Sequence, residues 1–266
     1  MIRDITLGQY YSGNSPVHRL DPRTKILLVF AYIISLFAVK DFIGFAICGA
    51  ALAIVVIISR IPLSFILRGM KPIMMILAFT FILNIFMVDG HILWQWKFLK
   101  ITEEGIYRAL FMGLRLILLI ISSSLLTLTT KPIALTDGLE KLMSPLAAIK
   151  VPTHEIAMMM SIALRFIPTL LSETDKIMKA QQARGADFET GNILQRAKSL
   201  IPILVPLFIS AFRIASDLAM AMEARCYRGG RGRTRMNEIK YGINDVIAGI
   251  FAILLIAALM LYRRFV

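Results

Sequence analysis

Charged residues are scarce in this sequence, and cysteines are scarcer still. Only 18% of its 266 residues are charged, whereas soluble globular domains have about 25%. The two cysteines, Cys48 and Cys226, are too few for a disulfide framework, so a reducing or membrane setting is expected. These shortages exclude a soluble enzyme of ordinary composition.

Sequence motifs for nucleotide binding, metal binding and catalysis are missing as well. No G-x-x-x-x-G-K-[ST] segment occurs, so the chain is not expected to hold ATP in a P-loop. The three histidines, His18, His91 and His154, lie in separate segments, which predicts no metal site. No paired carboxylates or nucleophile–base set stands out. We therefore expect a protein without catalytic activity of its own and without a cofactor.

Apolar residues and positive charge are what the sequence does contain. Hydrophobic residues make up 58% of the chain, and the formal net charge is +13. The mean hydropathy is +0.73. A water-soluble nucleic-acid-binding protein would not combine this charge with long apolar runs. An integral membrane protein, embedded in the lipid bilayer with a basic cytosolic face, explains both properties.

Five apolar runs predict the membrane-spanning helices. A spanning helix needs about 20 apolar residues. The first and third runs are shorter, so flanking residues such as Thr24, Lys25 and Lys40 are expected to extend them. The expected fold class is an all-α integral membrane protein with about five transmembrane helices and a cytosolic block of long amphipathic helices. The runs are Ile26–Val39, Phe42–Ser59, Ile73–Val88, Leu110–Thr129 and Val246–Tyr262.

The placement of lysine and arginine predicts the orientation. If the N-terminus is cytosolic, 23 of the 30 basic residues fall on the cytosolic side and six outside, as the positive-inside rule requires. The remaining one, Arg115, lies within a span and is expected to pair with a carbonyl or a lipid headgroup, or to orient helices. The expected segments are cytosolic 1–25, four spans in 26–129, a cytosolic block at 130–243 and a last span in 244–266.

The block at 130–243 is the most polar part of the chain. It holds 16 of the 30 basic and 10 of the 17 acidic residues. Apolar residues at three- and four-residue spacing predict one helix over 153–184 and a second from about Ile193 to about Tyr227. Three prolines are expected to remove a backbone hydrogen bond each and to bend these helices: Pro168, Pro202 and Pro206.

Both helices are expected to end in similar sequences, Gln182-Ala183-Arg184-Gly185 and Glu223-Ala224-Arg225-Cys226. An arginine at a helix C-terminus is favoured by the helix dipole and presents five donors in a planar fork. Such a slim tip can dock into an acidic groove of another protein by contacting carboxylates or carbonyls. The alternative is that Arg184 and Arg225 are only solvated charges that cap their helices.

The apolar faces of the two helices are expected to contact each other or a partner protein rather than water. Methionine within them suits an adaptable interface. The residues on the first helix are Ile156, Met160, Ile167 and Leu171, and those on the second are Leu204, Phe208, Phe212 and Ala215.

The glycine- and arginine-rich segment 229–233 has two interpretations. A membrane-proximal basic loop that attracts anionic lipid is favoured. An RGG-like tail for nucleic acid is the alternative, although no nucleic-acid partner is expected.

A self-contained permease remains a different interpretation of the whole chain. In that case 153–171 and 199–214 would be further spans, seven in all, and the chain would need a polar site near the middle of the membrane. The sequence offers few candidates for such a site: Asn84, Ser122–Ser124 and Arg115.

The chain resembles the transmembrane T component of energy-coupling factor (ECF) transporters, the EcfT family, over nearly its whole length. The segment Ser15-Pro16-Val17-His18-Arg19-Leu20-Asp21-Pro22-Arg23-Thr24-Lys25 is similar to the family's segment before its first span. The order of four spans, a long cytosolic helical block and one last span also fits. The most specific features are Ala183-Arg184-Gly185 and Ala224-Arg225-Cys226, the second with cysteine in place of the motif's glycine.

This resemblance implies a non-catalytic subunit of an ABC-type importer. The family joins two cytosolic ABC-type ATPases, similar to EcfA and EcfA′, to a membrane-embedded substrate-binding S component. The two arginine-tipped helix ends would insert into grooves of the two ATPases, and the apolar faces would hold the S component. ATP-driven motion would then release a vitamin or similar micronutrient into a prokaryotic cell. The N-terminus and the coupling-helix domain would be cytosolic.

Overall fold

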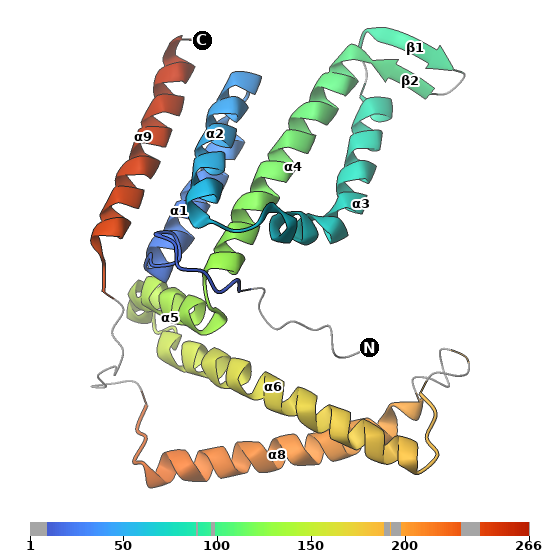
Figure 1. Cartoon of the computed structure of the whole chain (residues 1–266), viewed down its shortest axis with the longest axis vertical. Helices are drawn as coiled ribbons and strands as arrows, with labels where there is room; N and C mark the ends of the chain where they lie inside the picture. Colours follow the sequence, from blue (N-terminus) through green and yellow to red (C-terminus); the bar gives the residue numbers. More distant parts are fainter. Residues whose placement is uncertain are drawn as a thin grey trace. The chain divides into compact units, whose positions relative to one another are not determined.

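The computed structural model describes residues 10–88, 90–96, 99–188, 192, 198–229 and 240–265. Helices form nearly all of the regular structure in this part of the chain (Figure 1), which confirms the all-α membrane fold. The helices are α1 (Pro22–Ala38), α2 (Phe42–Ser59), α3 (Leu63–Met87), α4 (Glu103–Thr129), α5 (Pro132–Met143), a 3-10 helix (Ser144–Ile149), α6 (Thr153–Ala183), α8 (Ile201–Ala224) and α9 (Ile243–Phe265).

The chain divides into two compact units. Residues 8–139 and 238–266 form the first, called here the bundle unit, and residues 140–237 form most of the second, called here the helix-pair unit. Within the bundle unit, α1 packs against α4 and α9, and α3 packs along α4 (Figure 1). Within the helix-pair unit, α6 packs against α8.

Helix α1 begins before the first apolar run of the sequence. Its N-terminus is capped by Asp21, whose carboxylate accepts a hydrogen bond from the Arg23 backbone N–H at 2.8 Å. Pro22 fits the first turn because its missing N–H has no helical partner there. Thr24 and Lys25 therefore extend the helix beyond its apolar run, whereas Lys40 does not, because the helix ends at Ala38.

The bundle unit also contains a β-hairpin that was not predicted from the sequence. Strands β1 (Ile92–Trp96) and β2 (Leu99–Thr102) are antiparallel and connect α3 to α4. Thr102 then caps α4 by accepting a hydrogen bond from Gly105 N–H at 3.1 Å. Glycine is required at 105 because a Cβ there would lie 2.9 Å from the Ile85 carbonyl of α3.

Arg115 is anchored inside the bundle unit, in agreement with one of the predicted alternatives. Its guanidinium donates a hydrogen bond to the Val39 carbonyl at 3.2 Å and lies 5.1–5.8 Å from the ring centres of Phe37, Phe45 and Phe111. A cation over aromatic faces is attracted by their quadrupoles. Arg115 therefore holds α4 against the end of α1.

Among the residues that the structure describes, five or six helices are candidates for crossing a membrane by length and composition. Five are α2, α4, α6, α8 and α9, and α3 is the sixth if its two halves, which meet at 64°, count as one span. Helix α1 has 17 residues, about 25 Å at 1.5 Å per residue. Because α6 and α8 are apolar enough to be spans, the five-span topology stays a prediction.

Candidate functional site: two arginine-tipped helix ends

The helix pair α6–α8 positions the two predicted motifs. Helix α6 begins at Thr153, as predicted, near a hydrogen bond between His154 Nδ1 and Glu140 Oε1 at 3.1 Å. Helix α8 begins at Ile201, and the predicted start at Ile193 lies outside the described residues. The predicted helix is not continuous, because the chain turns at Leu200.

The prolines of the pair differ in their positions. Pro202 lies in the first turn of α8, where no helical hydrogen bond is lost, so the expectation that it bends the helix was wrong. Pro168 and Pro206 lie inside α6 and α8, respectively, and each removes one backbone donor from its helix.

Helix α6 ends in a backbone cap built around Gly185. The Gly185 N–H donates to the Gln182 carbonyl at 2.9 Å, and the Ala186 N–H donates to the Gln181 carbonyl at 3.0 Å. These two bonds form a Schellman motif. Gly185 has φ +87°, the left-handed conformation that such a cap requires, and Arg184 is the last residue before it.

Helix α8 ends in the same way, although its motif has no glycine. The Cys226 N–H donates to the Glu223 carbonyl at 2.8 Å, and the Tyr227 N–H donates to the Met222 carbonyl at 3.0 Å. Cys226 has φ +54° and occupies the position of Gly185 in the first motif. The departure from glycine therefore changes the residue and keeps the fold of the helix end.

The two arginines occupy equivalent positions with nearly identical backbones. Arg184 has φ −88° and ψ 7°, and Arg225 has φ −89° and ψ 13°. Within the described part of the chain, neither guanidinium makes a hydrogen bond or an ion pair. The last helical carbonyls already receive backbone N–H donors, so capping does not require the arginine side chains. All six motif residues are exposed: Ala183, Arg184, Gly185, Ala224, Arg225 and Cys226.

The C-terminal ends of α6 and α8 lie at opposite ends of the helix pair (Figure 1). The helices cross as antiparallel partners that contact each other. The arginines therefore form two separate tips, and each tip can bind its own partner.

The predicted apolar residues divide between the two helices. On α6, Ile156, Ile167 and Leu171 are half-buried, and Met160 is 38% exposed. On α8, Leu204, Phe208 and Phe212 are 46%, 61% and 73% exposed, and Ala215 is exposed too. The α8 residues thus form an uncovered apolar face.

A second stripe on α8 makes the internal contact and was missed from sequence. Ile203 is buried, and Leu207, Ile214 and Leu218 are half-buried. Their helical spacing was visible in the sequence, but α8 is apolar on several sides, so periodicity alone did not distinguish the inner stripe from the outer one.

The described residues provide no group of three or more side chains suited to a metal ion. The glycine- and arginine-rich segment 229–233 lies outside the described residues except for Gly229.

Similarity to known proteins adds the decisive observation. A family model described as a cobalt transport protein, CbiQ, matches residues 13–236. A protein of Ruminiclostridium cellulolyticum is 60% identical over 247 residues, which cover 93% of this chain and 92% of the relative. That relative is named energy-coupling factor transporter transmembrane protein EcfT. The chain belongs to the EcfT family.

Two further relatives with the same name cover the chain from end to end. The EcfT protein of Thermosediminibacter oceani is 56% identical over 265 residues, covering 100% of both chains. That of Bacillus subtilis is 47% identical over 265 residues, covering 99% of this chain and 100% of the relative. The protein is therefore a transmembrane component of an ECF transporter, with several spans in a prokaryotic cell membrane.

Proposed function

We propose that this EcfT-family protein couples two cytosolic ATPases to a membrane-embedded S component that binds a vitamin or similar micronutrient. The protein binds neither ATP nor the micronutrient and catalyses no reaction itself. Arg184 and Arg225 each enter an acidic groove of one ATPase, and the outer face of α8 holds the S component. The N-terminus and the helix-pair unit are cytosolic.

The observation that carries this proposal is the duplication of the helix end. Two helices of different sequence finish in the same backbone cap, with an exposed arginine at the same place in each. A solvated capping charge has no need for such equivalence. Two homologous partners with similar grooves would require it, because each groove must accept the same shape and the same donor fork.

The outer face of α8 supports the second half of the proposal. Large apolar side chains at Phe208 and Phe212 lie exposed in the chain alone, and contiguous apolar surface of this kind marks interaction sites. A lipid-facing surface would also be apolar. However, a lipid-facing α6–α8 pair would carry Arg165 and Arg213 in its spans, and an arginine at mid-membrane costs at least ~2.5 kcal/mol.

Three of the candidate polar groups for the permease alternative already have hydrogen-bond partners within the chain. Asn84 donates to the Thr80 carbonyl at 2.8 Å, and Ser122 donates to the Leu119 carbonyl at 2.9 Å. Arg115 donates to Val39. Because these candidate groups are bonded to backbone carbonyls, they favour helix packing over substrate binding.

The test of the proposal is the double substitution Arg184→Glu and Arg225→Glu in the native complex. We expect both ATPases to be lost from the purified membrane complex, because losing one buried charge-assisted contact costs about 2–5 kcal/mol and glutamate also repels an acidic groove. The matched control is Arg165→Glu with Arg213→Glu, which makes the same charge change on exposed positions of the same two helices. Undiminished ATPase retention in the first variant would refute the docking role.

A further inference from the structure

The N-terminal segment Ser15–Lys25 forms a buried polar network that the proposed function does not yet use. Ser15, Asp21 and Lys25 are 1%, 3% and 5% exposed. Burial of polar and charged groups is costly unless they are paired. The partners of these residues therefore indicate what the segment holds together, and all of them belong to the bundle unit.

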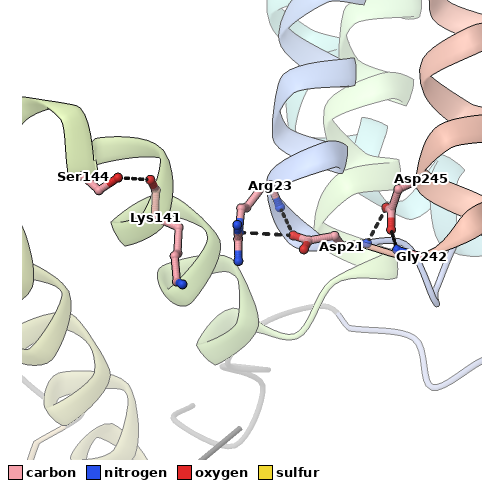
Figure 2. A network of polar contacts seen from close by, with 6 residues as sticks. All are labelled: Asp21, Arg23, Lys141, Ser144, Gly242 and Asp245. Atoms are coloured by element: carbon pink, nitrogen blue, oxygen red, sulfur yellow. Dashed lines mark hydrogen bonds and ion pairs between the residues drawn. The ribbon is translucent and has the colours of Figure 1, made fainter. Parts of the chain in front are cut away.

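Asp245 joins the beginnings of two helices (Figure 2). Its Oδ1 accepts a hydrogen bond from the backbone N–H of Asp21, the N-cap of α1, at 2.8 Å. Its Oδ2 accepts one from the Gly242 N–H, next to the start of α9, at 2.7 Å. Asp245 is 6% exposed. A carboxylate is favoured here because both helix N-termini carry partial positive charge.

Lys25 makes the complementary connection to the end of α4. Its ammonium group donates to the carbonyl of Thr129, the last residue of α4, at 2.8 Å, and to the His18 carbonyl at 3.2 Å. A cation is favoured at a helix C-terminus, where the dipole is negative. Asp21 and Asp245 also attract the Lys25 charge.

The network lies within the bundle unit, near the places where the chain leaves that unit and returns to it. The chain leaves the bundle unit at residue 140, inside α5, the helix that follows α4, and it re-enters at residue 238, shortly before α9. Lys25 holds the end of α4, ahead of the outgoing helix α5, and Asp245 holds the start of α9 on the returning side. Helix α1 connects the two, because Asp21 and Lys25 lie in its first turn and cap.

We propose that Lys25 and Asp245 are positioning residues for energy coupling. Through α1, they hold together the end of α4 and the start of α9, between which the helix-pair unit is inserted in the chain. Motion of the helix pair then acts on the bundle unit as a whole. Without the network, the end of α4 and the start of α9 move independently. Motion of the helix pair then displaces the segments that link the two units and is not transmitted to the bundle unit. This inference rests on the coupling function proposed above.

The experiment compares Lys25→Met and Asp245→Ala in the complete complex with ATPases and S component. We expect both variants to retain their partners. Substrate uptake per ATP hydrolysed should fall about tenfold, which corresponds to about 1.4 kcal/mol of lost coupling. Lys25→Arg, which keeps charge and donors, should recover most of the uptake. Unchanged uptake per ATP in both variants would overturn the proposal.

Two matched controls lie at the other end of α1. Lys40→Met removes an exposed lysine, and Asp41→Ala removes an aspartate at the N-cap of α2 whose side chain makes no capping bond. Both should leave uptake per ATP unchanged. A tenfold loss in the controls as well would mean that any charge change at a helix end impairs the protein, and would overturn the specific role.

A reversible tether covers the case in which Asp245→Ala destabilises the protein. The double substitution Asp21→Cys and Asp245→Cys, in a background lacking Cys48 and Cys226, would replace the bridge by a disulfide. We expect coupling under oxidising conditions and its loss on reduction. Equal coupling in the two states would contradict the proposal. The wild-type complex in the same preparation distinguishes failure of the positioning role from failure of the proposed coupling function. If the wild-type protein does not retain ATPases, the coupling function itself is refuted.

Discussion

The bundle unit and the helix-pair unit use polar groups in opposite ways. Near the start of α1, Asp21, Lys25 and Asp245 are buried and bonded inside the unit. At the ends of α6 and α8, Arg184 and Arg225 are exposed and make no hydrogen bond or ion pair with other described residues. The first set bonds to groups within its own unit, whereas the second set has donors available for partners.

The apolar residues follow the same division. The bundle unit has buried clusters, such as Leu36, Phe45 and Cys48 between α1 and α2. In α8, only Ile203 is buried, and Phe208 and Phe212 are mostly exposed. Since exposed apolar surface is unfavourable in water, the outer face of α8 needs a covering surface that α6 does not provide. The comparison predicts that substitutions in the helix-pair unit affect partners before stability.

Topology gives the largest expected effect, because it is all or none. A single cysteine at Arg184, in a background lacking Cys48 and Cys226, should resist an impermeant thiol reagent added to intact cells and react once the membrane is opened. The physical reason is the set of basic residues between α6 and α8, which the positive-inside rule places in the cytosol. Labelling from outside would show that α6 crosses the membrane and would support the permease.

A charge on the outer face of α8 should give the next largest effect. Phe208→Glu, or Met160→Glu on α6, should weaken S-component association by about 2–5 kcal/mol, because an unpaired charge would be buried in the interface. ATPase retention should stay largely intact. The control is Ser216→Glu, which adds the same charge at an exposed polar position of α8. Loss of both partners together would point to misfolding of the helix pair.

The two helix ends should respond oppositely to exchange of their third motif residue. Gly185→Ala should destabilise its cap by about 1–2 kcal/mol, because a non-glycine residue is strained in the left-handed region; no atom lies within 4 Å of the added Cβ, so no clash contributes. Cys226→Gly should relieve the same strain and stabilise its cap by up to about 1 kcal/mol. The ATPase affinity of each single variant, measured by titration, should fall for Gly185→Ala and rise for Cys226→Gly. A change of the same sign in both variants would argue against equivalent caps.

The smallest expected effect is a pH dependence of the bundle unit. Burial lowers the pKa of His18, and the nearby Lys25 charge lowers it further, although the hydrogen bond to the Tyr11 carbonyl opposes this. The folded state therefore favours neutral His18. The contribution of neutral His18 to the free energy of unfolding is fully present above the ordinary pKa of 6.5. It is lost as pH falls below that value toward the lowered pKa of the folded state.

Thermal unfolding in detergent between about pH 7.5 and 5.5 measures this dependence. Wild-type protein should lose more stability on acidification than His18→Gln, which keeps a polar side chain but does not titrate. An identical pH response in the two proteins would exclude His18 as its source.

Much of the fold and the helix tips could be predicted from sequence because the signals are local. Apolar runs mark α2, α4 and α9, and a glycine after Arg184 marks the end of α6. The cap at Cys226 was harder to predict, since cysteine has no preference for the left-handed conformation that it adopts there. Similarity between the two motifs was the only signal available.

Long-range polar contacts could not be predicted in this way. Asp21 and Asp245 are 224 residues apart in sequence and meet only because α1 and α9 pack together. The break at Leu200 and the hairpin β1–β2 also depend on the surrounding structure, because their residues have no strong turn signal. For the same reason, only the packing of α6 against α8 distinguishes the inner apolar stripe of α8 from its exposed outer face.

The antiparallel crossing of α6 and α8 makes the helix pair a spacer of fixed length between its two tips. Helix α8 has 24 residues, which is about 36 Å at 1.5 Å per residue, and the two tips lie at opposite ends of the pair (Figure 1). A rigid spacer of this length limits the distance between two proteins that dock at the tips as proposed above. Under the proposed coupling function, the two docked ATPases approach or separate during an ATP cycle; because the helices cannot stretch, the angle at which they cross must then change. A change in spacing at the tips thereby becomes a rotation at the crossing.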